Sequence, residues 1–253
     1  TDEGPKTSPA AFNNGVAPCL KIVTDEGYSV TGTHEHRIKR FNVEKQCIEW
    51  ATFDSIRPGD QLMLFLDQHM DTRTIPLVAP DASNKHHNQR WPERFPMELT
   101  GDIAFVLGYM CGNGFVASGQ DDYRIGFSIP HSGMYLVDGL SDLLADLFGS
   151  NIRHHIQQKP NDASVTLVID NKAVKDFFVI NGLAKSTSLE ACIPAAVRRS
   201  GRSVMASFLQ GLFEADGSPN HGYLSLCTRS KRLAEEVQTA LSGLGCPTKV
   251  FEQ

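Results

Sequence analysis

The sequence predicts an α+β protein, in which a small all-β unit precedes a larger domain with an internal helix-and-strand repeat. Residues 18–65 alternate apolar and polar side chains between turn signals, a pattern typical of short strands. Farther along, two apolar helical runs at 104–115 and 204–218 each carry two small residues four positions apart. A motif that recurs after about a hundred residues indicates an internal repeat.

The first part of the chain divides by composition. Residues 1–15 are polar and contain Gly, Pro and Asn, so they are interpreted as a leader or linker. The β unit is expected over residues 16–66, with a hairpin that turns at Glu26-Gly27 and a later turn at Pro58-Gly59-Asp60 that leads into its last strand. Residues 67–98 are polar and punctuated by proline, which predicts a linker.

The larger domain is expected over residues 99–253, with repeat one at 99–198 and repeat two at 199–253. Periodicity predicts an order of helix, two strands, helix, two strands, helix in repeat one. After the first helix these elements fall at a hairpin over 115–129, a helix over 134–148, strands at 152–158 and 164–170, and a helix over 173–180. Repeat two continues with a strand at 222–230, a helix at 230–245 and a strand at 247–253, and it is expected to be truncated there.

Composition limits the possible functions. The formal net charge is −5, which weakens a nucleic-acid hypothesis without excluding it, because a local basic face can exist on an acidic chain. No apolar run is long enough to span a bilayer, so we expect no membrane partner. The six cysteines show no metal-ligand spacing, which predicts reduced thiols and a cytoplasmic location.

Small residues in the two helical runs predict how the helices pack. Gly108 and Gly112 share one face of the first helix, and Gly211 and Ala215 share one face of the second. Because small side chains let two helix backbones approach closely, we expect the helices to pack on each other in a pseudo-twofold pair. Their C-terminal ends then lie side by side.

Those ends are the candidate catalytic centre. Asp216 precedes Gly217, which is expected to stop the helix in a left-handed conformation, so the carboxylate lies near unpaired helix carbonyls. Carboxylate and carbonyl oxygens bind hard divalent cations, with Mg²⁺ as the default and Mn²⁺ as the substitute. The predicted metal ligands are Asp216, Asn113, Gly112 and Ala215. Two such sites a few ångströms apart suit in-line cleavage of a phosphodiester.

The segments LQGLFEADGS at 209–218 and LGYMCGNG at 107–114 resemble the LAGLIDADG homing endonucleases. The resemblance implies two αββαββα pseudo-repeats in a monomer that cleaves double-stranded DNA. Two positions depart from the family pattern. Asn113 stands where the family usually has an acid, and Glu190-Ala191-Cys192 precede Ile193-Pro194 where many members have a lysine. Lys185 lies nearby in the sequence and is the remaining candidate catalytic lysine.

The resemblance also implies that alternate positions on the strands read base edges in the DNA major groove. Polar strand residues are equally expected on the solvated face of any half-exposed sheet. The candidate DNA-binding residues are Arg124, Ser128, Arg153, His155, Gln157, Thr166, Ser225, Thr228 and Arg229.

The stretch GYSVTGTHEHRI at 27–38 resembles a block of inteins and other Hint domains, and residues 50–62 resemble the block that follows it. The resemblance implies that Thr33 supports His36, which promotes the first acyl shift of splicing. Host-protein exteins are then the covalent partners. An intein needs a nucleophile where this chain has Thr1 and a terminal His-Asn where it has Glu252-Gln253, so we expect an interior piece that does not splice alone. Cys19 is expected to be packed.

Two functions are compatible with the sequence. One is an intein-encoded, metal-dependent endonuclease that uses Asp216. The other is a degenerate LAGLIDADG module that binds DNA, or nicks one strand, without double-strand cleavage. The β unit favours the first and Asn113 favours the second.

Overall fold

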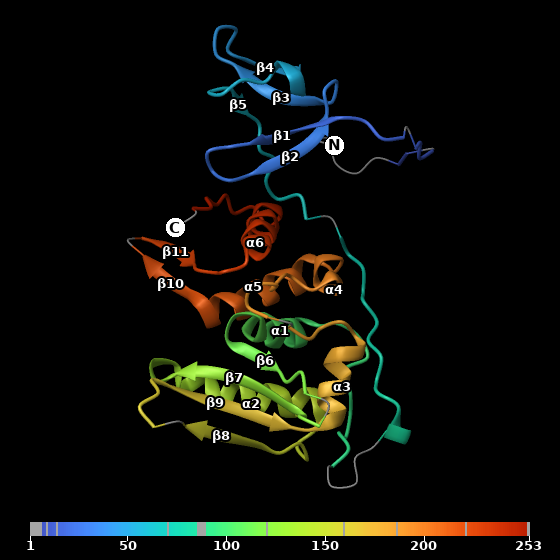
Figure 1. Ribbon diagram of the computed structural model, residues 1–253, viewed down its shortest axis with the longest axis vertical. Helices are drawn as coiled ribbons and strands as arrows, with labels where there is room; N and C mark the ends of the chain where they lie inside the picture. Colours follow the sequence, from blue (N-terminus) through green and yellow to red (C-terminus); the bar gives the residue numbers. More distant parts are fainter. Residues whose placement is uncertain are drawn as a thin grey trace. The chain divides into compact units, whose positions relative to one another are not determined.

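The computed structural model describes residues 7–8, 10–13, 15–69, 71–84, 90–119, 121–158, 160–185, 187–220 and 222–251. The chain forms two compact units (Figure 1), here called the N-terminal unit, residues 1–70 with 238–253, and the central unit, residues 71–237. The sequence placed 199–253 in one repeat, whereas the contacts group 238–253 with the N-terminal unit. In the described parts of the chain no helix is both long and apolar enough to cross a membrane.

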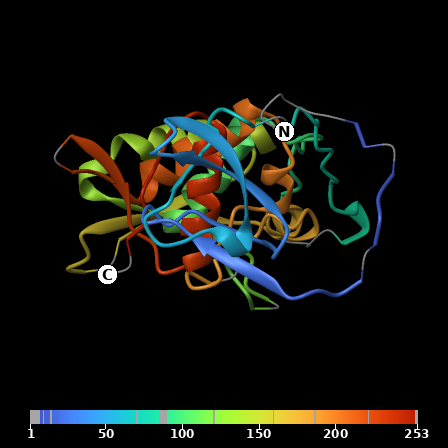
Figure 2. The same ribbon diagram turned by 90° about the horizontal axis from the view of Figure 1, so that it is seen from above.

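The N-terminal unit is built from short antiparallel strands, as the alternation predicted. Its bounds are β1 Cys19–Val23, β2 Ser29–Thr33, β3 Arg37–Asn42, β4 Cys47–Thr52, the 3-10 turn η1 Phe53–Ser55, and β5 Gln61–Leu62. Strands β1 and β2 form a hairpin, blue in Figure 2, and a second sheet has the order β4-β3-β5. Gly27 has φ of +92° in the hairpin turn and Gly59 has φ of +94° before β5, conformations that favour glycine. Cys19 is exposed, so the expectation that it is packed was wrong.

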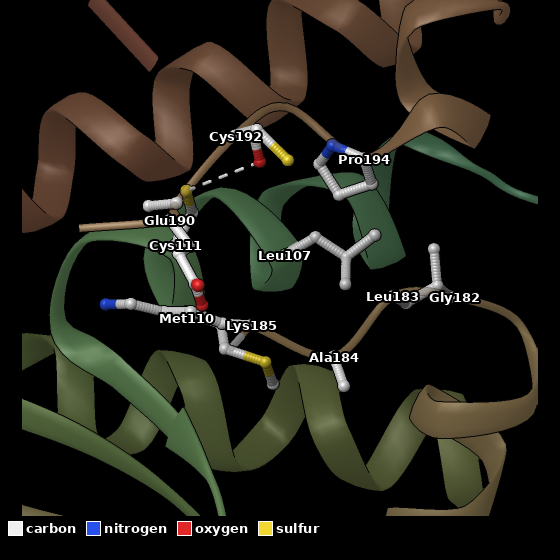
Figure 3. Close-up of a pocket in the computed structure, with 11 residues that line it drawn as sticks. Leu107, Met110, Cys111, Gly182, Leu183, Ala184, Lys185, Glu190, Cys192 and Pro194 are labelled. Atoms are coloured by element: carbon white, nitrogen blue, oxygen red, sulfur yellow. Dashed lines mark hydrogen bonds between the residues drawn. The ribbon is translucent and has the colours of Figure 1, made fainter. Parts of the chain in front are cut away.

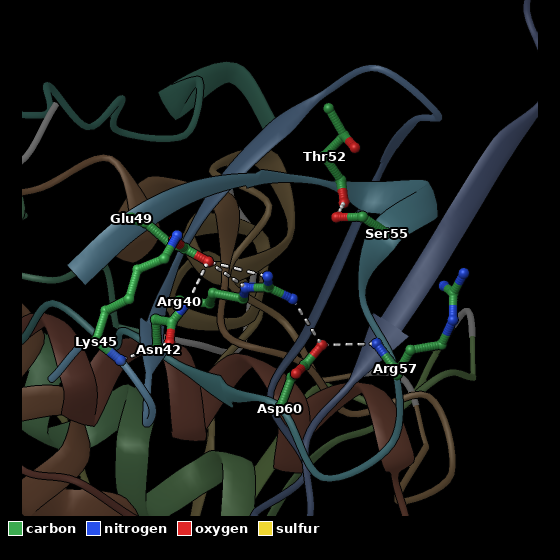
Figure 4. A network of polar contacts seen from close by, with 8 residues as sticks. All are labelled: Arg40, Asn42, Lys45, Glu49, Thr52, Ser55, Arg57 and Asp60. Atoms are coloured by element: carbon green, nitrogen blue, oxygen red, sulfur yellow. Dashed lines mark hydrogen bonds and ion pairs between the residues drawn. The ribbon is translucent and has the colours of Figure 1, made fainter. Parts of the chain in front are cut away.

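A polar network ties the three strands of the second sheet together (Figure 4). The guanidinium of Arg40 on β3 donates to Glu49 on β4 at 2.9 Å and lies 3.4 Å from Asp60, just before β5. Asn42 donates to the same Glu49 carboxylate at 3.0 Å. Hydrogen bonds from Asn42, Arg40 and Lys45 lower the pKa of Glu49 to about 2.

The end of the chain packs against the β1–β2 hairpin of the same unit. The helix α6 spans Lys231–Gly243, and its residues from Gln238 onward belong to the N-terminal unit. The Tyr28 hydroxyl accepts from Ser242 at 2.9 Å and from the Thr248 amide at 3.1 Å, and the Val250 amide donates to Glu26 at 2.9 Å. The strand predicted at 247–253 is absent from the described residues 247–251, because these tail amides bond to single turn groups and side chains instead of a neighbouring strand.

The central unit contains the helix and strand order that the sequence predicted for 99–180. Its bounds are α1 Gly101–Asn113, β6 Gly114–Val116, β7 Arg124–Pro130, the 3-10 turn η3 His131–Gly133, α2 Tyr135–Phe148, β8 His154–Gln158, β9 Ser164–Asp170, α3 Lys172–Ile180, α4 Ala195–Arg198, α5 Arg202–Asp216, β10 Gly217–Asn220 and β11 Tyr223–Leu226. The antiparallel order of the main sheet is β6-β7-β9-β8, and β10 and β11 form a separate ribbon.

The core of the central unit lies on one face of the main sheet. Ile125, Phe127 and Ile129 alternate along β7 and are fully buried, and α1 and α3 both contact this strand. A cluster of aromatic rings extends the core, with the Phe148 and Phe177 centroids 5.4 Å apart. The opposite face of the sheet is therefore the face that is not used for the core.

The segment predicted as a linker follows the surface of the central unit. Only the short 3-10 turn η2 Ala82–Asn84 and an isolated bridge between Pro76 and Glu98 are regular in the described part of it. Leu77 is buried, and the Asn181 side chain bonds both the amide and the carbonyl of Val78. Residues 71–84 and 90–98 are thus a packed strap of the central unit, held by side chains that have no sequence periodicity.

Candidate functional site

The site is organised by helices α1 and α5, whose backbones touch. A Cβ added at Gly108 would lie 1.9 Å from the carbonyl oxygen of Phe208, and one added at Gly211 would lie 2.1 Å from the carbonyl oxygen of Phe105. Each distance is far below van der Waals contact, so each position accepts only hydrogen. The two contacts are reciprocal, and they fix the helices side by side up to their C-terminal ends.

Gly217 after α5 has a different role from the one predicted. Its φ is −76°, which is extended, so the expected left-handed stop was wrong. A Cβ at Gly217 would instead lie 2.3 Å from the carbonyl oxygen of Phe213, and one at Gly114 would lie 2.6 Å from the Met110 Cα. Both helices pass directly into a strand that turns back over the last helical turn, and only glycine leaves room for this close approach.

The end of α1 is closed by an amide. The Nδ2 group of Asn113 donates to the carbonyl oxygen of Ala215 at 2.7 Å. This bond joins the last residue of α1 to the last turn of α5. The carbonyl that was expected to ligate a metal therefore already has a protein donor.

The end of α5 carries the carboxylate of Asp216 beside a lysine. Lys185 donates from Nζ to the carbonyl oxygen of Gly112 at 2.8 Å. Burial raises the pKa of Asp216, and the positive charge of Lys185 opposes this rise. Burial lowers the pKa of Lys185, against the opposing effects of Cys111 and Asp216. The fold thus brings Lys185 to the helix ends although it lies far from them in the sequence.

A small pocket adjoins this centre (Figure 3). It is lined by Leu107, Met110 and Cys111 of α1 and by residues of the segment after α3, among them Lys185, Glu190 and Cys192. The Cys111 thiol faces the Cys192 carbonyl oxygen at 3.9 Å, and burial raises the pKa of this thiol to about 11. Glu190 and Cys192 were known from the sequence only as departures from the family pattern, and the structure places them on the wall of the pocket.

The donor set fits a divalent cation at one end and not at the other. At the end of α5, the Asp216 carboxylate is an oxygen ligand of the kind that Mg²⁺ and Mn²⁺ bind, and the Gly112 carbonyl, which accepts from the Lys185 ammonium, keeps a second lone pair. At the end of α1, the Asn113 amide is neutral and gives its N–H to Ala215. Among the described residues no group of three or more His, Cys, Asp or Glu side chains is arranged to hold a metal.

The predicted base-reading residues of the main sheet share its outer face. Ser128 pairs with Thr166, and Thr166 pairs with Gln157, so these three side chains form one row across the strands. His155 lies two residues before Gln157 on the same face of β8. Arg124 also faces outward, but Asp122 binds its guanidinium at 2.6 Å, a partner that the sequence pattern did not indicate. Arg153 lies just before β8, two residues before His155, and is exposed.

The second ribbon holds fewer of the predicted readers. Ser225 lies on β11 opposite Ser218, with their hydroxyl oxygens 3.0 Å apart. Thr228 and Arg229 lie beyond the last residue of β11, so their assignment to the sheet was wrong. The strand ends at Leu226 because the chain turns into α6, where the Thr228 hydroxyl accepts from the Ser230 amide at 3.2 Å.

The predicted splicing residues lie in the N-terminal unit at the end of β2. The His36 amide donates to the Thr33 carbonyl at 3.0 Å, which closes a turn and brings the two residues together. The His36 ring meets the buried Phe53 edge-on, with a centroid distance of 5.1 Å. Both Thr33 and His36 are exposed, so both side chains are accessible.

The comparison with protein families concerns the C-terminal part of the chain. Residues 203–253 match the family model of the LAGLIDADG-like domain. This LAGLIDADG-like segment contains almost all of α5, the carboxylate of Asp216, the β10–β11 ribbon and α6.

Curated relatives match over most of this chain. The DNA gyrase A protein of Mycobacterium gordonae is 27% identical over 248 residues, which cover 92% of this chain and 39% of that protein. The replication factor C small subunit of Pyrococcus horikoshii is 24% identical over 223 residues, which cover 88% of this chain and 21% of that protein. The chain therefore spans less than half the length of the curated relatives it matches.

Solved structures with similar shape include two homing endonucleases. I-DmoI in complex with DNA and manganese has a TM-score of 0.46 at 21% identity, over 60% of this chain and 82% of that one. I-WcaI bound to its DNA recognition sequence has a TM-score of 0.39 at 12% identity, over 62% of this chain and 75% of that one.

Proposed function

We propose that this chain is a site-specific DNA endonuclease of the LAGLIDADG type, carried within an intein, that cleaves one DNA strand at a single acidic centre. The observation that carries the proposal is the difference between the two juxtaposed helix ends. Asp216 presents a carboxylate oxygen that would lie 3.0 Å from a Cβ added at Gly112, whereas Asn113 uses its amide to close the Ala215 carbonyl. One cation site favours nicking over double-strand cleavage.

Each residue of the centre has a definite role in this proposal. Asp216 and the Gly112 carbonyl hold the cation, Mg²⁺ or Mn²⁺. The bound metal supplies an activated water and charge stabilisation for the leaving oxygen. Lys185 adds a positive charge for the phosphate, and its hydrogen bond to the Gly112 carbonyl holds the ammonium at the helix ends.

The outer face of the main sheet is the proposed DNA surface. An antiparallel sheet face or ribbon fits the major groove, and hydroxyl, amide and imidazole groups recognise base edges there. Ser128, Thr166, Gln157 and His155 present these groups from adjacent strands. Their common direction supports a role in base readout.

Two observations support an origin inside an intein. The chain is similar over most of its length to parts of a DNA gyrase protein and of a replication factor protein, which carry different names and come from different organisms. One segment shared by two otherwise different proteins is expected of an inserted element. The turn that joins Thr33 to His36 is compatible with the role of that pair in splicing, with host-protein exteins as covalent partners.

A second candidate function is DNA binding without cleavage. It is favoured by the fact that both helix-end carbonyls, Gly112 and Ala215, already accept protein hydrogen bonds. In that case the Lys185 ammonium stays in place of a metal ion.

A cleavage assay separates these functions. A supercoiled plasmid library with randomised inserts is incubated with Mg²⁺ or Mn²⁺ and the wild-type protein, Asp216→Ala, or the control Asp138→Ala, which removes an exposed acid of α2. We expect nicked circles from the wild type and the control and a loss of at least about a hundredfold in Asp216→Ala. Linear product from the wild type contradicts the single centre. Retained binding in a gel shift without any product establishes the second function.

A further inference from the structure

The outer face of the main sheet contains an apolar row between polar ones. Phe115 on β6 pairs with Gly126 on β7, Gly126 pairs with Val168 on β9, and Val168 pairs with His155 on β8. Directly paired residues point to the same face, so this row runs across the sheet and ends at the His155 ring. The neighbouring rows are polar, with Ser128, Thr166 and Gln157 on one side and Arg124 and Asp170 on the other.

The Phe115 ring is fixed in position by the row itself. A Cβ added at Gly126 would lie 2.2 Å from Cε1 and 2.6 Å from Cζ of Phe115, so the ring rests on the bare backbone of β7. Val168, the next member of the row, is fully buried, whereas Phe115 keeps 40% of its surface exposed. An aromatic ring is thus held in a set orientation with one part open to solvent.

Phe115 makes no contribution to the core on the other face. That core is formed on β7 by Ile125, Phe127 and Ile129, which are buried on the opposite side of the sheet. Exposure of a large apolar surface among polar groups is unfavourable in water and favourable against an apolar ligand group. In the DNA major groove the apolar group on a base edge is the C5-methyl of thymine.

We propose that Phe115 is a specificity-determining residue whose exposed ring contacts the C5-methyl group of a thymine in the DNA target. This inference rests on the proposed function, because it requires that the outer face binds double-stranded DNA. The polar rows on either side then contact the neighbouring base pairs, and Gly126 is the positioning residue that lets the ring lie low enough to fit the groove.

The experiment first finds a target and then removes single methyl groups. Double-stranded sites are selected from a randomised pool with the wild-type protein without divalent cations, and each thymine of the selected site is replaced in turn by deoxyuridine. Deoxyuridine lacks only the C5-methyl. At one thymine we expect wild-type affinity to fall about three- to tenfold, as the loss of one buried methyl group predicts.

The same substitutions are then measured with variants. Phe115→Ala should bind the intact site more weakly and should lose its sensitivity to that one methyl group, which is the signature of direct coupling in a double-mutant cycle. Phe115→Leu keeps an apolar side chain and should keep part of the sensitivity. Tyr223→Ala removes an exposed aromatic ring of the second ribbon and should leave the sensitivity unchanged.

The outcomes distinguish a failure of the proposed DNA-binding function from a failure of the proposed role of Phe115. Failure of the wild-type protein to enrich any site contradicts the proposed DNA-binding function. Enrichment without a methyl-sensitive thymine overturns the role of Phe115 alone. The role of Phe115 is also overturned if the Phe115→Ala variant, shown to be folded by its thermal transition, loses as much affinity as the wild type when that methyl group is removed.

Discussion

The C-terminal ends of α1 and α5 have the same packing and different chemistry. Along the helices the contacts are reciprocal, with Gly108 against Phe208 and Gly211 against Phe105. At the last residues the reciprocity ends. α1 finishes with a neutral amide that donates its own N–H across the interface, and α5 finishes with a partly buried carboxylate next to a lysine.

The difference shows that the helix contact and the centre are specified separately. The stripe of small residues sets the distance between the helices whichever residue follows it. The residues at each end then decide which group meets the carbonyl of the other helix: the neutral Asn113 amide bonds the Ala215 carbonyl, whereas the Gly112 carbonyl near Asp216 accepts from the Lys185 ammonium. Substitutions at Gly108, Asn113 and Asp216 test this separation.

The largest effect is expected from Gly108→Ala. The added methyl group would lie 1.9 Å from a backbone oxygen of α5, so the helices must separate. We expect the free energy of unfolding to fall by about 3 kcal/mol or more, as for severe overpacking, with loss of activity. Urea denaturation of the wild type and the variant measures the change in the free energy of unfolding.

The matched control is Gly139→Ala. Gly139 lies on the exposed face of α2 and an added Cβ there meets nothing within 4 Å. This change should raise the free energy of unfolding by about 0.5–1 kcal/mol, because alanine favours the helix. A similar loss in both variants would show that helix contact is not what Gly108 provides.

A smaller effect is expected from Asn113→Asp, which makes the two ends alike. Without metal the new carboxylate faces the Ala215 carbonyl with no donor, and we expect a loss of about 1–3 kcal/mol. Mg²⁺ or Mn²⁺ should recover this loss and convert nicked product to linear product. Thermal unfolding with and without metal measures the first effect.

Asn113→Ala serves as the control for that experiment. It removes the same hydrogen bond to Ala215 without adding a charge. It should be destabilised to a similar extent and should show no greater response to metal than the wild type. Equal metal responses in the two variants would mean that the end of α1 does not take part in cation binding.

The smallest effect is the pH dependence of Asp216. Burial raises the pKa of this carboxyl above its ordinary 3.8, so the folded state binds the proton more tightly than the unfolded chain does. Asp216 therefore lowers stability progressively as the pH rises from about 3.8 to the raised value, and the cost is constant above it.

Asp216→Asn removes this titration. Compared with the wild type, the variant should gain stability as the pH rises through that window and should show no gain below it. Denaturation midpoints at several pH values measure the difference. A gain that is already complete at pH 3 would show that burial of the charged form is not its cause.

The sequence predicted those parts of the structure that depend on local periodicity. Four-residue spacing of small side chains indicated which helices would pack, and alternation placed β7, β8 and β9. The contact of Lys185 with Gly112 could not be predicted, because it depends on the path of an irregular segment after α3. Arg124 was predicted as a DNA-binding residue, and its ion pair with Asp122 depends on the conformation of the turn before β7, which a periodic pattern does not describe.

Two further differences between the predicted and the observed structure concern Gly217 and the tail from residue 247. Gly217 was interpreted through its backbone freedom, whereas the fold uses its lack of a side chain near Phe213. The tail from residue 247 had a strand composition, yet Tyr28 and Glu26 supply partners that keep it irregular. Both outcomes depend on contacts between distant parts of the chain, which a periodic pattern does not contain.

The contact at Gly108 also limits which substitutions this sequence can accept in evolution. A side chain added in an ordinary core can be accommodated when its neighbour becomes smaller. The atoms that Gly108 and Gly211 meet belong to the backbone, and no substitution can shorten a carbonyl group. Neither glycine can therefore be replaced through a compensating change in the other helix, whereas Asn113 and Asp216 meet the other helix through side chains, which substitution can alter.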